Sequence, residues 1–380
     1  LNDANIRPET VISRPDQFVG VTTYTGSVSP QTVGGINFTS DLIWIKSRTH
    51  TGWHILQDSV RGYGKILFSN SSNAEVGNAN DLISDVSSTG FSVNTNYAGG
   101  TDTATTTTSG TNSYVGWCWK AGGSKGTFNI DDVSYASAAA AGLDGGLTVT
   151  GASVGTKQGF SIIKATGSNS QNSFKHGLGK VPKFVIAKDM DNSRAWYIYH
   201  GSLGANYRGS FDAAAFTSDT GYFGSGMTDT LVTLKSGGSG GNNYNGADMI
   251  YYVWADVPGL QKFGRFTGNG SADGPFVELG FRPSIVWIRR TDSGQNWAVH
   301  DAERDKFNEC DKNLAFNLAS QENNSGDIGT GDANEMDFLS NGFKLRDSAA
   351  VQNASNGTYI YCAWAEAPTI NLYGGSSNAR

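Results

Sequence analysis

The sequence predicts an all-β protein made of three tandem antiparallel β-sandwich modules. Two observations support this prediction: a set of short strand-like segments occurs three times in 380 residues, and helical periodicity is almost absent. Fifty glycines and only 16% charged residues are typical of many short strands joined by tight turns, because glycine adopts the backbone conformations that such turns require. The length also exceeds what a single core usually organises.

The clearest repeated segment is a strand that ends in a tryptophan. Placing these tryptophans in one column aligns three further positions, and the four columns are Trp119, Trp254 and Trp364; Phe18, Phe160 and Phe263; Trp44, Ile186 and Trp287; and Trp53, Trp196 and Trp297. The spacing from the opening phenylalanine to the second-strand column is 26, 26 and 24 residues in the three copies. Agreement at several positions indicates three copies of one module.

The columns divide the chain into six parts. These are an extended arm or linker (1–17), module one (18–121), a Gly/Ala/Ser-rich insertion or linker (122–159), module two (160–259), module three (260–368) and a tail (369–380). The strand count of each module fits a jelly-roll or an immunoglobulin-like sandwich. The jelly roll is favoured because the Cys…Trp…Cys spacing of immunoglobulins is missing.

Charge and hydropathy exclude two classes of partner. The net charge is −6 and the lysines and arginines are scattered, so nucleic acid is not expected as a ligand. Apolar runs are far shorter than the roughly 20 residues that span a bilayer, so membrane insertion is not expected. The chain begins with Leu1, which leaves open either processing or truncation of a longer protein.

The three cysteines, Cys118, Cys310 and Cys362, have no metal-like spacing and are expected to be small buried residues. Alternation along a strand places Cys118 and Cys362 on opposite faces.

Tryptophans are candidates either for stacking on sugars or for core packing. Core packing is favoured because residues repeated at equivalent strand positions are most simply anchors of a repeated core. The predicted core anchors are Trp44, Trp53, Trp119, Trp196, Trp254, Trp287, Trp297 and Trp364. Trp117 lies outside the columns.

Catalytic and metal sites are not strongly indicated. Glu335 and Asp337 begin the E-x-D-x-x-E pattern of laminarinase-type hydrolases, but Ser340 stands where the third acid is needed, so the carboxylate pair is incomplete. The acidic loop 321–337 offers weak calcium candidates in Asp327, Asp332 and Asp337, although Asp and Asn are also ordinary turn residues. No other cofactor is expected. An Asp58–Arg61 pair is predicted at a turn, as a surface contact of little energetic weight.

Several motifs resemble a known family. They are Tyr24-Thr25-Gly26, Thr267-Gly268-Asn269-Gly270, His176-Gly177-Leu178-Gly179, Trp44-Ile45-Lys46 and Gly116-Trp117-Cys118-Trp119-Lys120-Ala121-Gly122-Gly123. Together they resemble the repeated concanavalin A-like (laminin G-like) jelly-roll domains of structural and tail proteins in tailed-bacteriophage virions. The resemblance covers nearly the whole chain, with module two the most divergent. It implies a virion location and contacts with other virion proteins.

The expected function is therefore that of a non-enzymatic structural component of a phage particle, such as a tail fibre or another appendage. The resemblance implies a homo-oligomer, most plausibly a trimer, whose loops and residues 122–159 contact neighbouring proteins or the host surface. A glycan-binding module, with or without calcium, is the alternative, and it predicts exposed aromatic residues such as Tyr97, Tyr207 or Tyr244. A glycoside hydrolase is a weaker third class.

Overall fold

The computed structural model describes residues 12–77, 82–94, 110–205, 207–211, 216–218, 222–224, 226–235, 242–323, 335–370 and 376–377. The prediction of an all-β protein is confirmed, because the described chain forms several antiparallel sheets and the helical turn η2 (Pro15–Gln17) is three residues long. No helix in these residues has the length and apolar character of a membrane span.

Module one contains a large sheet and a small sheet. The large sheet has the order β1 (Val19–Thr25), β9 (Ser113–Trp119), β3 (Leu42–Ser47), β4 (Ile55–Asp58). The small sheet has the order β2 (Gln31–Gly34), β8 (Gly90–Val93), β7 (Ile83–Ser87), and a short pair is formed by β5 (Lys65–Ile66) and β6 (Val76–Gly77). Phe91 of the small sheet and Ile43 of the large sheet belong to one buried cluster, so the two sheets form a sandwich.

Module three repeats this plan. Its large sheet has the order β21 (Gln261–Thr267), β28 (Thr358–Ala365), β23 (Pro283–Arg290), β24 (Ala298–Asp301), β25 (Leu314–Ala315). Its small sheet has the order β22 (Phe276–Glu278), β27 (Gly342–Leu345), β26 (Met336–Leu339). Beyond it, β29 (Thr369–Ile370) pairs with β30 (Ser376–Ser377).

Module two has the same central strands and a longer sheet. The repeated part is β13 (Phe160–Thr166), β20 (Asp248–Ala255), β15 (Pro182–Asp189), β16 (Tyr197–His200), β17 (Tyr207–Ser210), β18 (Thr217–Ser218), with β14 (Asn172–Lys175) paired to β19 (Leu231–Leu234). Residues 122–159 add three strands on the far side of β13: β12 (Thr148–Gly155), β10 (Phe128–Ile130) and β11 (Val133–Tyr135). This segment is thus an integral part of the second sheet.

Each large sheet is buried on both faces. In β9, Tyr114 and Cys118 face the sandwich interior of module one, whereas Trp117 and Trp119 face away from it. Alternate residues of a strand point to opposite faces, which explains why these strands are apolar throughout. The predicted opposite orientation of Cys118 and Cys362 is confirmed, because Cys362 lies on the outer face with the tryptophans.

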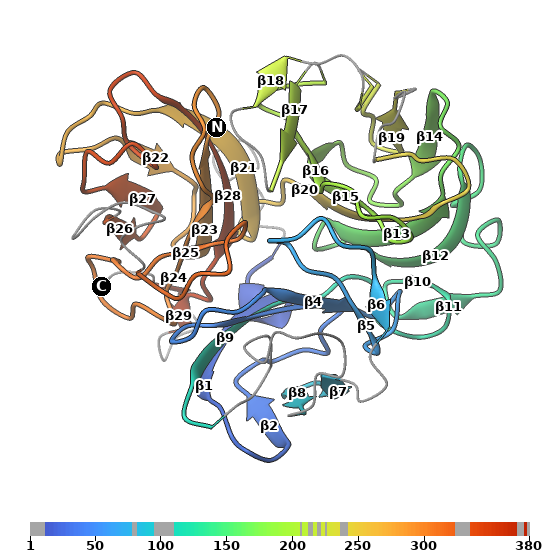
Figure 1. Ribbon diagram of the computed structural model, residues 1–380, viewed down its shortest axis with the longest axis horizontal. Coiled ribbons are helices and arrows are strands. Elements are labelled where there is room, and N and C mark those ends of the chain that lie inside the picture. The colour runs from blue at the N-terminus through green and yellow to red at the C-terminus, as the bar shows by residue number, and fades with distance from the viewer. Residues whose placement is uncertain are drawn as a thin grey trace, which may run out of the picture.

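The outer faces of the three large sheets meet in one central aromatic core. Figure 1 shows the modules as three lobes around this centre. Trp119, Trp254 and Trp364 contact one another edge to face, with ring centroids 5.5, 6.2 and 6.4 Å apart. The modules therefore follow one another in the sequence but close into a ring in space, with module three against module one.

Candidate functional site

The three seams of the ring are bridged by equivalent backbone hydrogen bonds. We call them seam 1–2, seam 2–3 and seam 3–1, after the modules that meet there. The N–H groups of Glu75, Phe216 and Glu322 donate to the carbonyls of Met190, Thr291 and Arg48, over 2.7, 3.1 and 2.8 Å. Each acceptor lies four residues after the second-strand column position of its module. Because the bond recurs at seam 3–1, the ring is closed.

A second equivalent position is the last residue of β4, β16 and β24. Asp58, His200 and Asp301 occupy it, since they pair with Leu42, Phe184 and Ile285. Each side chain contacts the closing strand of a neighbouring module. The hydroxyl of Tyr252 donates to Asp58 at 2.7 Å, and the indole of Trp117 donates to Asp301 at 3.0 Å. At seam 2–3, His200 Nε2 lies 3.1 Å from the carbonyl of Tyr361.

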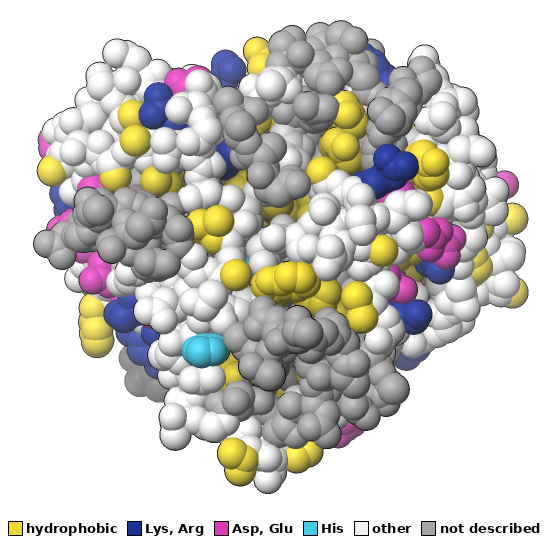
Figure 2. Space-filling model, in the orientation of Figure 1, with side chains coloured by type: hydrophobic (Ala, Val, Ile, Leu, Met, Phe, Trp, Pro, Cys, Tyr) yellow, Lys and Arg dark blue, Asp and Glu magenta, His cyan; other side chains and the backbone are white. Residues whose placement is uncertain are grey.

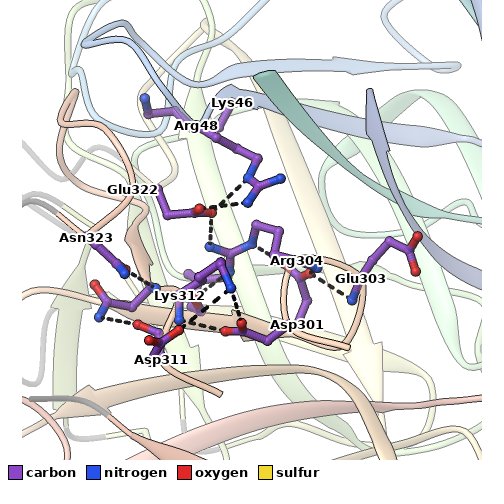
Figure 3. Close-up of polar contacts among 12 residues, drawn as sticks. Lys46, Arg48, Asp301, Glu303, Arg304, Asp311, Lys312, Glu322 and Asn323 are labelled. Carbon is purple, nitrogen blue, oxygen red and sulfur yellow. Dashed lines mark hydrogen bonds and ion pairs between the residues drawn. The ribbon is translucent and has the colours of Figure 1, made fainter. Parts of the chain in front are cut away.

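Seam 3–1 contains the most extensive polar cluster, which Figure 3 shows. Arg304 lies between Asp301 and Glu322, with its Nε 2.6 Å from Asp301 Oδ2 and its Nη1 3.1 Å from Glu322 Oε2. Arg48 of module one then binds Glu322 through two parallel hydrogen bonds of 2.8 and 2.9 Å. Asp301 and Arg304 have fully buried side chains. This geometry is the paired arrangement that a buried charge requires.

Local charges favour the ionised forms of Glu322 and Arg304 despite their burial. Burial favours the neutral form of Glu322, but the hydrogen bond from Arg48 and the charge of Arg304 outweigh it and hold the pKa of Glu322 below its usual value. Burial likewise opposes the charge of Arg304, yet the neighbouring carboxylates of Asp301 and Glu322 raise its pKa. Glu322 and Arg304 thus stabilise each other's charged form.

Seam 1–2 contains a near copy of this cluster. Arg61 Nε lies 2.5 Å from Asp58 Oδ2, and Arg61 Nη1 lies 3.2 Å from Glu75 Oε2. Arg61 Nη2 donates to the carbonyl of Leu56, as Arg304 Nη2 does to Val299. The prediction of a surface pair is wrong, because both side chains are at most 1% exposed. The pair forms as predicted, but Tyr252 of module two covers it.

The carboxylates of Asp301 and Asp58 are held on both oxygens by donors of the chain itself. Asp301 accepts hydrogen bonds from the backbone N–H groups of Glu303 and Arg304 and from the side chains of Arg304 and Trp117. Both carboxylate oxygens are thus occupied by donors on the chain itself. Asp58 is held in the same way by Val60, Arg61 and Tyr252.

Seven of the eight predicted tryptophan anchors are fully buried: Trp44, Trp119, Trp196, Trp254, Trp287, Trp297 and Trp364. They lie in the central core between the modules, whereas the sandwich interiors are filled by other residues. Trp53 is partly buried and packs against Phe68. Trp117, which the columns left out, is also fully buried and bridges seam 3–1.

The calcium candidates are only partly described. Asp327 and Asp332 lie outside the described residues, and Asp337 is 2.5 Å from Arg346 in an ion pair. Within the described part of the chain, no three His, Cys, Asp or Glu side chains are grouped as metal ligands. Among the aromatic candidates for glycan binding, Tyr97 lies outside the described residues, Tyr207 is 41% exposed, and Tyr244 stacks with Arg194 at 3.9 Å. Cys118, Cys310 and Cys362 are free and buried.

The seam clusters were not predicted from the sequence, although a signal was present. The motif Asp-x-x-Arg occurs shortly after the column tryptophans Trp53 and Trp297, as Asp58–Arg61 and Asp301–Arg304. Recurrence of a charged pair at an equivalent strand end indicates a repeated structural role.

Fold and site together define a class of protein: an all-β ring of three sandwich repeats that share one aromatic core and interlock through buried polar contacts. The chain belongs to the family described as domain of unknown function DUF7483, whose model matches residues 14–368. A search of curated proteins found no match.

Proposed function

We propose that this protein is a non-enzymatic structural component of a tailed-phage virion, such as a tail fibre or another appendage. The observation that carries the proposal is the closed ring, in which every module is locked to the next through a shared core and equivalent hydrogen bonds. Such a body is suited to holding surface loops in fixed positions, because rigid strands support variable loops. The motif resemblance to virion proteins supports the particle location.

The finer assignments belong to the same proposal. Each module is a concanavalin A-like jelly roll, a classification supported by its two packed sheets. Its partners are other virion proteins and further copies of this chain, with a trimer as the expected assembly. The visible face in Figure 2 carries small interspersed groups of acidic and basic side chains, which is compatible with protein neighbours and gives little attraction for nucleic acid.

A glycan-binding module is the second candidate, and the exposed ring of Tyr207 is the observation that favours it. Aromatic rings with an exposed face and a hydroxyl group suit contacts with sugars. On this alternative the ring would present a binding surface on module two.

Three measurements separate the candidates. Immunogold electron microscopy of gradient-purified phage particles should show label on the particles if the chain is a virion component, and absence of label would contradict that role. Light scattering should give the mass of a stable oligomer. A glycan array, run with and without a chelator, should show no binding. A monomer whose glycan binding is lost in Tyr207→Ala would favour the second candidate instead.

A further inference from the structure

The opening strands of the three large sheets differ in what lies on their outer edge. β1, β13 and β21 each pair with the closing strand of their own module on one side. On its other side, β13 pairs antiparallel with β12, whereas β1 and β21 end their sheets. An open sheet edge presents unpaired backbone N–H and C=O groups that another strand can bind.

At seam 1–2, β12 is seated in a space bounded by both modules. A Cβ atom on Gly151 of β12 would lie 3.1 Å from Val60 of module one. Ser153 donates to Asp41 at 3.0 Å. Val154 of β12 lies directly against Gly122 and Gly177, where an added Cβ would meet it within 3 Å.

The equivalent space at seam 3–1 is an open groove of about 390 Å³. Four residues that line the groove are counterparts of residues around β12. By distance from the second-strand column, Glu303, Ser284 and Gly35 correspond to Val60, Asp41 and Gly177, and by distance from the closing-strand tryptophan Ala367 corresponds to Gly122. Gly35 and Gly177 also share a left-handed backbone, with φ of 88° and 74°. Val19 to Val21 of β1 form the groove side that β13 forms at seam 1–2. The groove therefore corresponds to the space that β12 fills at seam 1–2.

The edge of β1 in this groove has free backbone groups. The carbonyl of Phe18 accepts a hydrogen bond from the N–H of Lys120, and the N–H of Gly26 donates to the carbonyl of Asn112. The backbone N–H and C=O groups of the even-numbered residues of β1 therefore point towards β9. Antiparallel pairing alternates, and the backbone groups of Val19 and Val21 consequently point away from β9. Within the described chain, nothing is hydrogen-bonded to them on that side.

At seam 2–3 the corresponding sheet edge is partly covered by the linker between modules two and three. There the linker folds back, and Val257 and Gln261 exchange two backbone hydrogen bonds of 3.0 Å, while Asp256 accepts from the N–H of Phe263. The linker thus covers the start of the β21 edge. Within the described residues, no linker covers the equivalent edge of β1 at seam 3–1.

We propose that the groove at seam 3–1 binds an extended segment of a partner protein, which adds to β1 as an antiparallel strand in the way that β12 adds to β13. Main-chain hydrogen bonds supply the affinity in this mode of recognition, and the flanking side chains select the sequence. The matching segment has small residues, because Gly151, Ala152 and Ser153 fill the equivalent seat. The inference does not depend on the virion assignment.

The direct test uses a fluorescein-labelled peptide that copies residues 147–156 and full-length protein, with binding followed by fluorescence anisotropy. We expect saturable binding. Val21→Pro removes one outward N–H and should weaken binding by at least about tenfold. The matched control Arg265→Pro removes an outward N–H from the edge of β21 and should leave the affinity unchanged. Lack of binding, or equal binding to Val21→Pro, would overturn the proposal.

A second variant keeps the test valid if proline disturbs folding. Glu303→Trp fills the groove from module three without altering β1, and its carboxylate pairs only at the surface, 3.3 Å from Lys306. Peptide binding should be lost in this variant and retained in Asp311→Trp, which places the same ring at an exposed position of module three. Equal binding by both variants would show that the peptide sits elsewhere.

Residue-resolved hydrogen–deuterium exchange locates the bound peptide. The amides of Val19 and Val21 should exchange rapidly in the free protein and slowly with peptide bound, while those of Arg265 and Thr267 should not change. Slow exchange of Val19 and Val21 in the free protein would show that the chain itself covers this edge, which would rule out an open seat for a partner.

Discussion

Two tryptophans on one strand show what a single residue contributes to the ring. Trp117 and Trp119 are alternate residues of β9, are both fully buried and both face the central core. The indole of Trp117 donates to Asp301 of module three, whereas the indole N–H of Trp119 has no partner among the described residues. Trp117 thus makes a hydrogen bond to a charged group that Trp119 lacks.

Replacing each tryptophan by phenylalanine isolates that hydrogen bond. Trp117→Phe should lower the free energy of unfolding by roughly 1.5–3 kcal/mol more than Trp119→Phe, because only the former leaves a buried carboxylate oxygen with one donor fewer. Urea denaturation of both variants measures the difference. Equal losses would mean that packing alone accounts for the contribution of Trp117 to the free energy of unfolding.

Buried histidines should make stability depend on pH. Burial lowers the pKa of His200 and of His300 from 6.5 to about 4. Between these values the unfolded chain binds protons that the folded chain does not, so stability is fully present above pH 6.5 and falls as the pH decreases towards 4. The slope is up to about 1.4 kcal/mol per pH unit for each histidine.

The variant His200→Gln should flatten this slope, since glutamine stays neutral and can still donate to the carbonyl of Tyr361. Thermal unfolding between pH 7 and pH 4.5 measures it. His50→Gln serves as the control, because His50 is an exposed histidine. An unchanged slope in His200→Gln would show that His200 does not contribute to the pH dependence of stability.

At the scale of elements, the Asp-x-x-Arg turns act as clamps between sheets. In both turns the arginine reaches back to a carbonyl of the strand that precedes it and forward to a glutamate in a later loop. The aspartate meanwhile binds the closing strand of another module. Each clamp therefore joins a strand, a loop and a second module.

Breaking one clamp should cost far more than breaking a surface pair. Asp301→Asn leaves Arg304 buried without its nearest carboxylate, and we expect a loss of about 3–5 kcal/mol in the free energy of unfolding. The control is Asp292→Asn in the more exposed Arg290–Asp292 pair, which should cost at most about 1 kcal/mol. Chemical denaturation measures both. Similar losses would show that the buried clamp contributes no more to the free energy of unfolding than the more exposed pair does.

The sequence predicted the all-β fold and the burial of seven of the eight column tryptophans, because repetition at fixed spacing marks a shared structural role. It did not predict which core those tryptophans enter. Alternation assigns Trp119 to one face of its strand but does not identify the surface that covers this face. Likewise, the turn motif predicted the contact between Asp58 and Arg61, but its burial depends on Tyr252, which is 194 residues away from Asp58 in the sequence.

At the scale of the whole molecule, the shared core couples the three modules. The buried cluster at the centre includes strands from every large sheet, so no module can unfold without exposing aromatic surface on the other two. Modules that bury separate cores unfold separately, whereas a common core favours a single transition.

Differential scanning calorimetry should therefore show one unfolding transition, with a calorimetric enthalpy close to the van't Hoff enthalpy. Trp364→Ala, which removes one ring of the central triad, should lower the transition temperature of the whole chain. Two or three separate transitions in the parent protein would contradict the coupling. The same would follow if Trp364→Ala shifted only part of the heat absorption.

The closure at seam 3–1 has a topological consequence. Modules three and one are held together there by the Arg48–Glu322 pair, the Trp117–Asp301 hydrogen bond and the central core, and by no covalent connection. Circularly permuted chains that begin at module two or module three retain the residues that make these contacts, and in such chains the break in the backbone lies at another seam.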